Sequence, residues 1–185
     1  MIYIVSGIHR SGTSMMMDLL VQSGIRPYYS KIREKQMQHG KDDYKLNKNF
    51  WETGVNDYMQ LGFTSELPDN CCVKIPAIGL PILSPAVGYK IIYMRRDPDS
   101  IRNSYIRAMP DDDFDNKYPS WPSHYWRLLD GVKGIMQTRR DVDLIELWYD
   151  DILKDPLNTI KKLIAHDIPI LESVVDLIDP QQRRF

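Results

Sequence analysis

The first residues that could do chemistry lie in a loop near the amino terminus. An apolar run, Ile2–Val5, leads into residues 7–12, which begin and end with glycine and hold Arg10 between them. A strand, such a loop and a helix in this order form a phosphate cradle, because backbone N–H groups and the helix dipole both favour anions. Nucleoside triphosphatases carry a lysine after the second glycine, whereas this chain has Thr13 there. The loop therefore predicts a phosphorylated nucleotide, and not necessarily ATP with magnesium. A tight turn whose glycines serve only the backbone is the alternative.

A second group of polar residues follows an apolar run in the middle of the chain. The run ends at Arg95 and Arg96, and Asp97 with Pro98 marks the first turn of a helix. Ser104 lies eight residues after Arg96, about two helical turns on and near the same face. A guanidinium and a hydroxyl placed in this way can bind one tetrahedral anion together. Arginines that are merely solvated at a helix start are the alternative.

The glycine loop needs a scaffold of strands and helices to position it. Short apolar or β-branched runs predict strands at Ile2–Val5, Cys71–Ile75, Lys90–Met94 and Leu144–Trp148. Because helical patterns lie between these runs, we expect an α/β fold in which helices cover both faces of a central parallel sheet. Ligands of such sheets bind at the carboxyl ends of the strands, where the glycine loop falls.

Helix boundaries are marked in the sequence as well. The pattern over Met15–Ser23 predicts a first helix closed by Gly24. Asp155 with Pro156 predicts another helix start of the kind described above. Segment 109–120 is acidic and flanked by prolines, so it predicts a long exposed loop.

Composition limits the possible functions. The 185 residues predict a single domain over 1–185, and the formal net charge of −1 argues against nucleic-acid binding. Cys71 and Cys72 are adjacent, poorly placed to bridge each other and without metal-ligand spacing, so we expect reduced thiols in a strand. The amino-terminal apolar run is too short for a signal peptide or a membrane span. We therefore expect a soluble, cytoplasmic protein without stable membrane insertion, whose oligomeric state the sequence leaves open.

Together the two motifs resemble those of the sulfotransferase superfamily, whose donor is 3′-phosphoadenosine 5′-phosphosulfate (PAPS). The first motif reads His9, Arg10, Ser11, Gly12, Thr13, Ser14, with His9 in place of the family's usual proline. The second is Arg96-Asp97-Pro98 followed by Ser104. The resemblance implies a three-layer αβα, P-loop NTPase-like sulfotransferase fold. It also implies that residues 10–14 bind the 5′-phosphosulfate and that Arg96 and Ser104 bind the 3′-phosphate.

Two segments near the carboxyl terminus extend the resemblance. Residues 148–163 resemble the family's Tyr-Glu-Asp-Leu…Asp-Pro unit, and residues 178–185 resemble the ending common in bacterial-type members. Arg183 and Arg184 stand where the family often places basic residues near the 3′-phosphate. A frayed basic tail is the alternative for these two arginines.

The resemblance further implies a reaction: sulfuryl transfer to a hydroxyl or amine acceptor, with adenosine 3′,5′-bisphosphate (PAP) as product. No metal is required, because the sulfuryl group carries less charge than a γ-phosphate. Arg10, assisted by Lys74, is the candidate cation for the bridging oxygen of the leaving group. Pro76 stands where cytosolic members place their histidine base. Glu52 is then the candidate base, because it ends a segment that resembles one in bacterial-type members, and His9 is the reserve.

Other interpretations stay open. Thr13 argues against a small-molecule or nucleoside kinase that uses ATP and magnesium, while the short chain and the absent histidine keep a non-catalytic nucleotide-binding module in view. Glu52 could equally be a solvated carboxylate at a helix start. The acceptor, a small molecule or glycan, is not specified by the residues. Trp121, Tyr125 and Trp126 could line its pocket or stack on adenine, although aromatic residues at helical spacing are more often part of a core.

Overall fold

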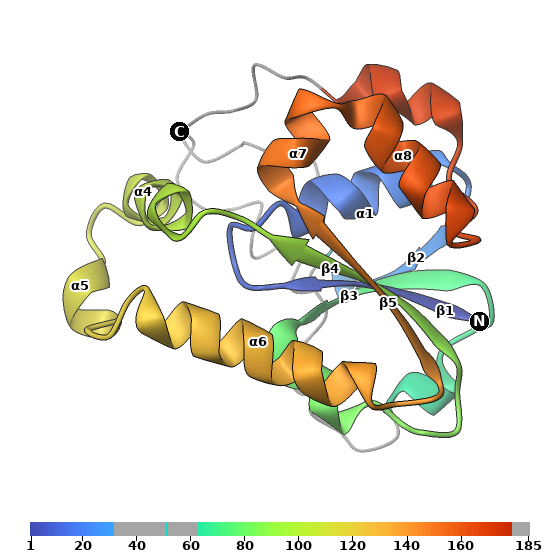
Figure 1. Ribbon diagram of the computed structural model, residues 1–185, viewed down its shortest axis with the longest axis horizontal. Helices are drawn as coiled ribbons and strands as arrows, with labels where there is room; N and C mark the ends of the chain where they lie inside the picture. Colours follow the sequence, from blue (N-terminus) through green and yellow to red (C-terminus); the bar gives the residue numbers. More distant parts are fainter. Residues whose placement is uncertain (32–50, 52–62, 179–185) are drawn as a thin grey trace.

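The computed structural model describes residues 1–31, 51 and 63–178, and these ranges contain one parallel sheet (Figure 1). Its strand order is β2-β3-β1-β4-β5, and every neighbouring pair runs parallel. The strands are β1 (Ile2–Gly7), β2 (Arg26–Tyr28), β3 (Cys71–Pro76), β4 (Tyr89–Arg95) and β5 (Val142–Trp148). The predicted α/β class with a central parallel sheet is therefore confirmed.

Helices cover both faces of this sheet (Figure 1). One face carries α1 (Thr13–Gln22), α7 (Tyr149–Lys154), α8 (Pro156–Ala165) and the 3₁₀ helix η4 (Glu172–Leu177). The other carries α6 (Ser123–Gln137) and the 3₁₀ helix η3 (Ala77–Ile82), while α4 (Pro98–Ala108) and α5 (Phe114–Lys117) lie beyond the carboxyl ends of the strands. A third 3₁₀ helix, η2 (Phe63–Glu66), precedes β3. Within the described ranges, no helix is long and apolar enough to cross a membrane.

Alternation along the strands separates two hydrophobic cores, one on each face of the sheet. Val5 of β1 packs into the core under α1 and α8, whereas Ile4 packs into the core under α6. The adjacent thiols divide in the same way, with Cys72 in the first core and Cys71 in the second. Both are buried and free, so the prediction of reduced thiols in a strand is confirmed.

The four strands predicted from apolar runs are all present, and β2 is an additional strand that the sequence did not reveal. β2 has three residues, of which two are exposed, so it shows no apolar run. It also contains Pro27. A proline is tolerated there because β2 lies at the edge of the sheet, where an outward-facing N–H has no ladder bond to lose.

The predicted helix starts are confirmed by their caps. The carboxylates of Asp97 and Asp155 accept hydrogen bonds from the backbone N–H groups three residues on, at 2.8 and 3.1 Å. Each is followed by a proline in the first turn of its helix, α4 or α8. At the end of α1 the capping residue is Ser23, and Gly24 follows it in a left-handed conformation with a φ of 90°. Gly24 therefore ends the helix as predicted, but from the position after the capping residue and not from the capping position itself.

Segment 109–120 is not the continuous exposed loop that its composition predicted. It contains α5, and the Phe114 side chain in that helix is only 3% exposed. The Phe114 ring makes edge-on contacts with Tyr105 and Trp121, with ring centroids 5.1 and 5.3 Å apart. A single buried aromatic residue among acidic neighbours produces no periodic pattern, so sequence analysis could not detect this anchored turn.

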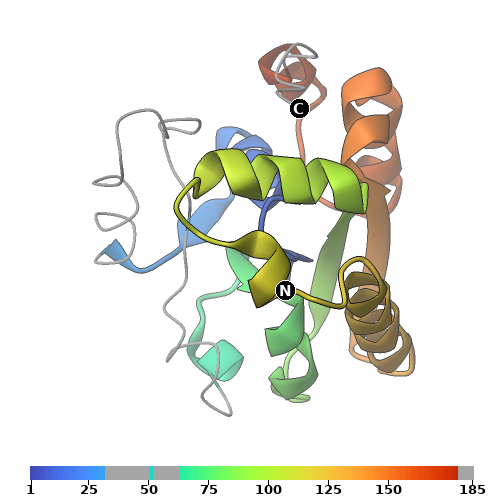
Figure 2. The ribbon, with the colours of Figure 1, turned by 90° about the vertical axis from the view of Figure 1, so that its left-hand side faces the viewer.

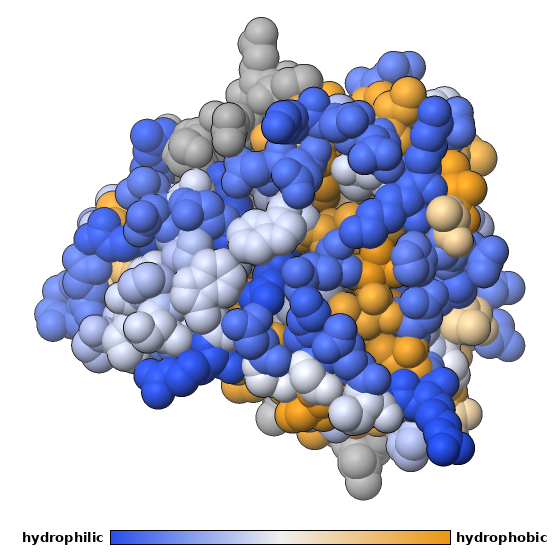
Figure 3. Space-filling model, in the orientation of Figure 1, coloured by the Kyte–Doolittle hydropathy of each residue, from blue (hydrophilic) through white to orange (hydrophobic). Residues whose placement is uncertain are grey.

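β5 forms one edge of the sheet, between α6 and α8. Apolar side chains are visible along this edge in Figure 3, and the half-buried Val142 and Leu144 pack against the core under α6. Lys162 of α8 donates a hydrogen bond to the backbone carbonyl of Glu146 at 2.9 Å. A charged side chain placed over an edge strand opposes pairing with a further strand.

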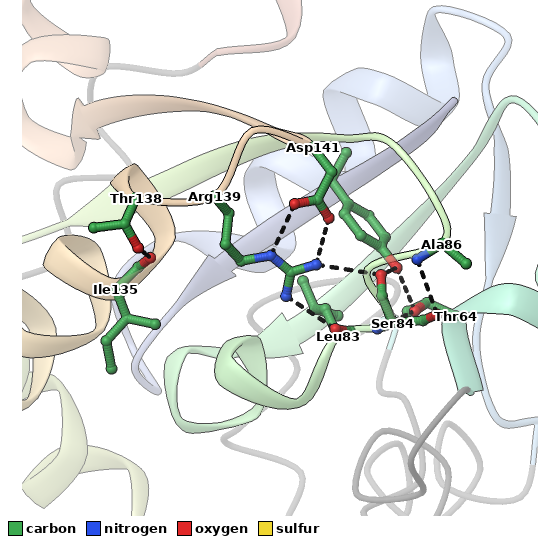
Figure 4. Close-up of polar contacts among 9 residues, drawn as sticks. Thr64, Leu83, Ser84, Ala86, Ile135, Thr138, Arg139 and Asp141 are labelled. Atoms are coloured by element: carbon green, nitrogen blue, oxygen red, sulfur yellow. Dashed lines mark hydrogen bonds and ion pairs between the residues drawn. The ribbon is translucent and has the colours of Figure 1, made fainter.

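A polar network ties together the loops at the amino-terminal end of the sheet (Figure 4). Arg139 forms an ion pair with Asp141 and donates to the carbonyl oxygens of Leu83 and Ser84, at 2.9 and 3.2 Å. Its guanidinium carbon lies 5.8 Å from the ring centre of Tyr89, the first residue of β4. Hydrogen bonding from Arg139 holds the pKa of Asp141 below its usual value. This network lies at the end of the sheet opposite to the glycine loop.

Candidate donor site

The loop between β1 and α1 folds into a tight turn at the carboxyl end of β1. The backbone N–H and the hydroxyl of Ser11 both donate to the carbonyl oxygen of Ile8, at 3.3 and 2.7 Å. Arg10 and Gly12 adopt left-handed conformations, with φ values of 69° and 91°. α1 begins at Thr13, and its capping position belongs to Gly12, which has no side chain to cap the N–H groups of the first turn. The N–H groups at the positive end of a helix dipole suit an anionic ligand.

Lys74 brings a cation to the same helix start. It lies on β3, where it pairs in register with Val5 of β1, and it is only 7% exposed. Its ammonium donates a hydrogen bond to the hydroxyl of Ser14, in the first turn of α1, at 3.2 Å. A buried ammonium beside the positive end of a helix strengthens the preference of this position for an anion.

Arg10 joins the two sequence motifs. Its Nε donates to the hydroxyl of Ser104 on α4 at 2.9 Å. Its backbone carbonyl accepts a hydrogen bond from Nη1 of Arg96 at 3.0 Å. Arg10 therefore contacts both Arg96 and Ser104, the two residues of the second motif that we predict to bind one anion together. Figure 2 looks onto this end of the sheet, where α4 crosses in front of the strands.

Arg96 is fixed by its main chain as well as by its side chain. Its backbone N–H donates to the Tyr125 hydroxyl at 3.3 Å, and its carbonyl accepts from the same hydroxyl at 2.6 Å. Burial raises the pKa of Tyr125, so the phenol stays protonated at neutral pH and can donate this bond. Tyr125 is fully buried, and Trp121 and Trp126 pack against the same core, as their helical spacing favours.

Tyr149, the first residue of α7, connects the loop to Arg96. The Arg96 guanidinium carbon lies 4.4 Å from the centre of the Tyr149 ring. A Cβ atom on Gly12 would come within 2.4 Å of the same ring, so only glycine fits at this position. Tyr149 is not among the predicted site residues, although it directly follows the β5 run and therefore had to lie at the carboxyl edge of the sheet. The contact of Tyr125 with Arg96 left no such signal, because the packing of α6 sets it.

The remaining predicted residues fall into two groups. His9 is exposed in the loop. Glu52, Arg183 and Arg184 lie outside the described residues, so their roles stay predictions. In the part of the chain that is described, no cluster of three or more His, Cys, Asp or Glu side chains could hold a metal ion.

Comparisons with known proteins bear on the fold. No protein-family model matches the sequence, and no curated protein does. Among solved structures, the chain is similar to retinol dehydratase in complex with androsterone and the inactive cofactor PAP, with 16% identity and a TM-score of 0.50. The likeness covers 98% of this chain and 64% of that one, so this chain spans less than two thirds of the length of that protein.

Two further solved structures are more distant, and we draw no conclusion from them. One is a retinol dehydratase with retinol and PAP, at 18% identity and a TM-score of 0.47, covering 95% of this chain and 62% of the other. The second is a sugar kinase from Janibacter sp. HTCC2649, at 14% identity and a TM-score of 0.40. That likeness covers 90% of this chain and 94% of the kinase chain. The first likeness, together with the parallel sheet and its two helical layers, shows that this chain shares the α/β fold of that retinol dehydratase.

Proposed function

We propose that the chain binds PAPS at the loop before α1 and transfers its sulfuryl group to a hydroxyl or amine acceptor. The observation that supports the proposal most strongly is the meeting of Arg10, Arg96 and Ser104 beside the start of α1. Guanidinium and hydroxyl donors next to a helix N-terminus match the phosphate and sulfate groups of such a donor. The order of the motifs and the fold support the same function.

Each side chain has its own proposed role. The N–H groups at the start of α1 hold the 5′-phosphosulfate. Arg10 and Lys74 stabilise the negative charge that develops on the bridging oxygen while the sulfur–oxygen bond breaks. Arg96 and Ser104 hold the 3′-phosphate through charge-assisted hydrogen bonds, because the phosphate that accepts them is ionised. Held at both ends, the donor is oriented for in-line attack by the acceptor.

The acceptor must also lose a proton, and we assign this step to Glu52, with His9 in reserve. Glu52→Gln should abolish turnover while PAP still binds. For the acceptor we propose a small molecule or a glycan. The similar retinol dehydratase structure holds the small molecule androsterone together with PAP, which supports the first of these classes.

The proposal is tested by calorimetric titration with PAP in EDTA, beside titration with ATP and magnesium. We expect PAP to bind without metal, and Arg96→Ala and Ser104→Ala each to weaken binding at least tenfold. The reason is that a hydrogen bond to a charged group contributes about 1.5–3 kcal/mol, and 1.4 kcal/mol is about tenfold in affinity. Arg102→Ala is the matched control, because Arg102 lies on the same helix but pairs with Asp115 on the exposed surface. The affinity of the Arg102→Ala variant for PAP should stay within about twofold of the affinity of the unsubstituted protein.

Other results would change the conclusion. Binding of ATP and magnesium alone would identify a kinase and refute the sulfotransferase function. PAP binding without turnover on any acceptor of a broad panel would favour a non-catalytic nucleotide-binding module. No binding of either nucleotide would leave the fold without its proposed ligand.

A further inference from the structure

Arg95 immediately precedes Arg96, but its side chain packs on the α6 side of the sheet and has no part in the proposed donor contacts. The side chain is only 6% exposed. Its guanidinium carbon lies 5.3 Å from the ring centre of Trp126 on α6 and 5.9 Å from that of Trp148, the last residue of β5. These distances are those of cation–π contacts, which are strongest where water is excluded.

Two carboxylates neutralise this buried cation. The Arg95 Nε donates to Glu146 of β5 at 3.3 Å, and its Nη2 pairs with Asp130 of α6. Glu146 is shared with Lys133, whose ammonium lies 2.7 Å from the same carboxylate oxygen. A buried charge is costly unless it is paired, so Arg95 favours the arrangement in which α6 and β5 both lie against the end of β4.

The partners of Arg95 and Arg96 are neighbours along the chain. Arg96 is held by the hydroxyl of Tyr125 and the ring of Tyr149. Arg95 lies against the residues next to these two, Trp126 and Trp148. The same two segments, the first turns of α6 and the β5–α7 junction, therefore contact both arginines. Tyr125 reaches the main chain of Arg96 from the α6 face of the sheet, whereas Tyr149 contacts its guanidinium from the opposite face. A shift of either segment away from Arg95 would carry a partner of Arg96 with it.

We propose that Arg95 is a positioning residue for Arg96. It holds the α6 start in the place where Tyr125 fixes the main chain of Arg96, and the β5–α7 junction in the place where Tyr149 contacts the Arg96 guanidinium, which donates to Arg10. The expected effect on PAP binding rests on the donor site proposed above, whereas the orientation of Arg96 is a property of the unliganded protein. It can therefore be tested with and without a nucleotide.

The test compares Arg95→Met with Arg139→Met. The side chains of Arg95 and Arg139 are 6% and 16% exposed, and each forms an ion pair with an acidic residue and contacts an aromatic ring. Arg139 lies at the opposite end of the sheet. We expect both variants to lose thermal stability and only Arg95→Met to lose affinity for PAP, by at least tenfold in calorimetry. Arg95→Lys serves as a second variant that keeps a cation for Glu146 but not the planar guanidinium. This variant should fold even if Arg95→Met does not. Its affinity for PAP should fall at least threefold, which is less than the loss expected for Arg95→Met.

A second readout needs no nucleotide. The side-chain Nε–H resonance of Arg96, assigned by its disappearance in Arg96→Lys, should be displaced by the ring current of Tyr149 in the unliganded protein. We expect it to move toward the position of a free arginine in Arg95→Met and to stay in place in Arg139→Met. If this occurs while the unsubstituted protein does not bind PAP, Arg95 positions Arg96 and the proposed function fails. An Arg96 resonance that stays in place in both Arg95 variants, or that moves equally in Arg139→Met, would overturn the inference.

Discussion

At the scale of single residues, the two glycines at the ends of α1 offer a matched comparison. Substituting each by alanine distinguishes the cost of backbone strain from the cost of a steric clash. Gly12 and Gly24 have φ values of 91° and 90°, so alanine at either position is destabilised by about 1–2 kcal/mol through the left-handed conformation. A Cβ at Gly12 would also lie 2.4 Å from the Tyr149 ring, whereas one at Gly24 meets no atom within 4 Å. We expect urea denaturation to show the larger loss of unfolding free energy for Gly12→Ala. PAP affinity should fall at least tenfold in this variant alone, because displacing Tyr149 releases Arg96.

Gly24→Ala is the matched control for this prediction, since it carries the same backbone strain without the contact. Equal losses of stability in the two variants, or unchanged PAP affinity in Gly12→Ala, would show that the Tyr149 ring moves aside freely. The link from the loop through Tyr149 to Arg96 would then be wrong.

The residue scale also shows what the sequence could and could not reveal about the site. Arg10, Arg96 and Ser104 were identifiable because their types and spacing within two short segments match an anion site. Tyr125 was not identifiable as a partner of Arg96, because its hydroxyl reaches the main chain of Arg96 only after α6 has packed on the sheet. Contacts between residues far apart in the chain depend on tertiary packing, to which local patterns are blind.

At the scale of elements, α4 and α8 begin with equivalent aspartate caps. Comparing the loss of each cap distinguishes an effect on helix stability from an effect on the position of a residue that binds the ligand. Asp97 caps α4, which carries Ser104, and Asp155 caps α8, which carries none of the proposed donor ligands. Asp97→Ala and Asp155→Ala should each cost about 1 kcal/mol of unfolding free energy. Only Asp97→Ala should also weaken PAP binding, by about threefold to tenfold, because fraying of α4 loosens the contact of Ser104 with Arg10. Equal PAP affinity in the two variants would show that α4 keeps Ser104 in place without its cap.

The elements that sequence analysis found and missed differ in how they are stabilised. The strand runs and the Asp-Pro helix starts carry their signals locally, in apolar composition and in a capping carboxylate. β2 and α5 carry none. β2 exists because α1 returns the chain to the edge of β3, and α5 is held in place because the Phe114 ring packs against Tyr105 and Trp121. Both depend on neighbours that are contributed by other parts of the chain.

At the scale of the whole molecule, the sheet divides the interior into two cores, and each core contains one thiol. Cys71 lies in the core under α6, and Cys72 lies in the core under α1 and α8. Burial raises the pKa of both thiols, that of Cys72 to about 12. At pH 8 the thiolate fraction of native Cys72 is then about one in ten thousand, so a disulfide reagent reacts only after the chain opens. The two residues are adjacent, which makes them reporters of the two layers at a single point of β3.

We therefore expect neither thiol to react with Ellman's reagent in the native protein at pH 8, and both to react after unfolding in urea. Single variants, Cys71→Ala and Cys72→Ala, isolate each reporter. If the two cores open together, the remaining thiol should react with the same rate constant and the same urea dependence in both variants. PAP at a hundred times its dissociation constant should slow both reactions about a hundredfold, because it binds only the folded state. Faster reaction of one thiol, with a weaker urea dependence, would show that its layer opens separately. Protection of only the slower thiol by PAP would then place the donor site on the layer that stays closed.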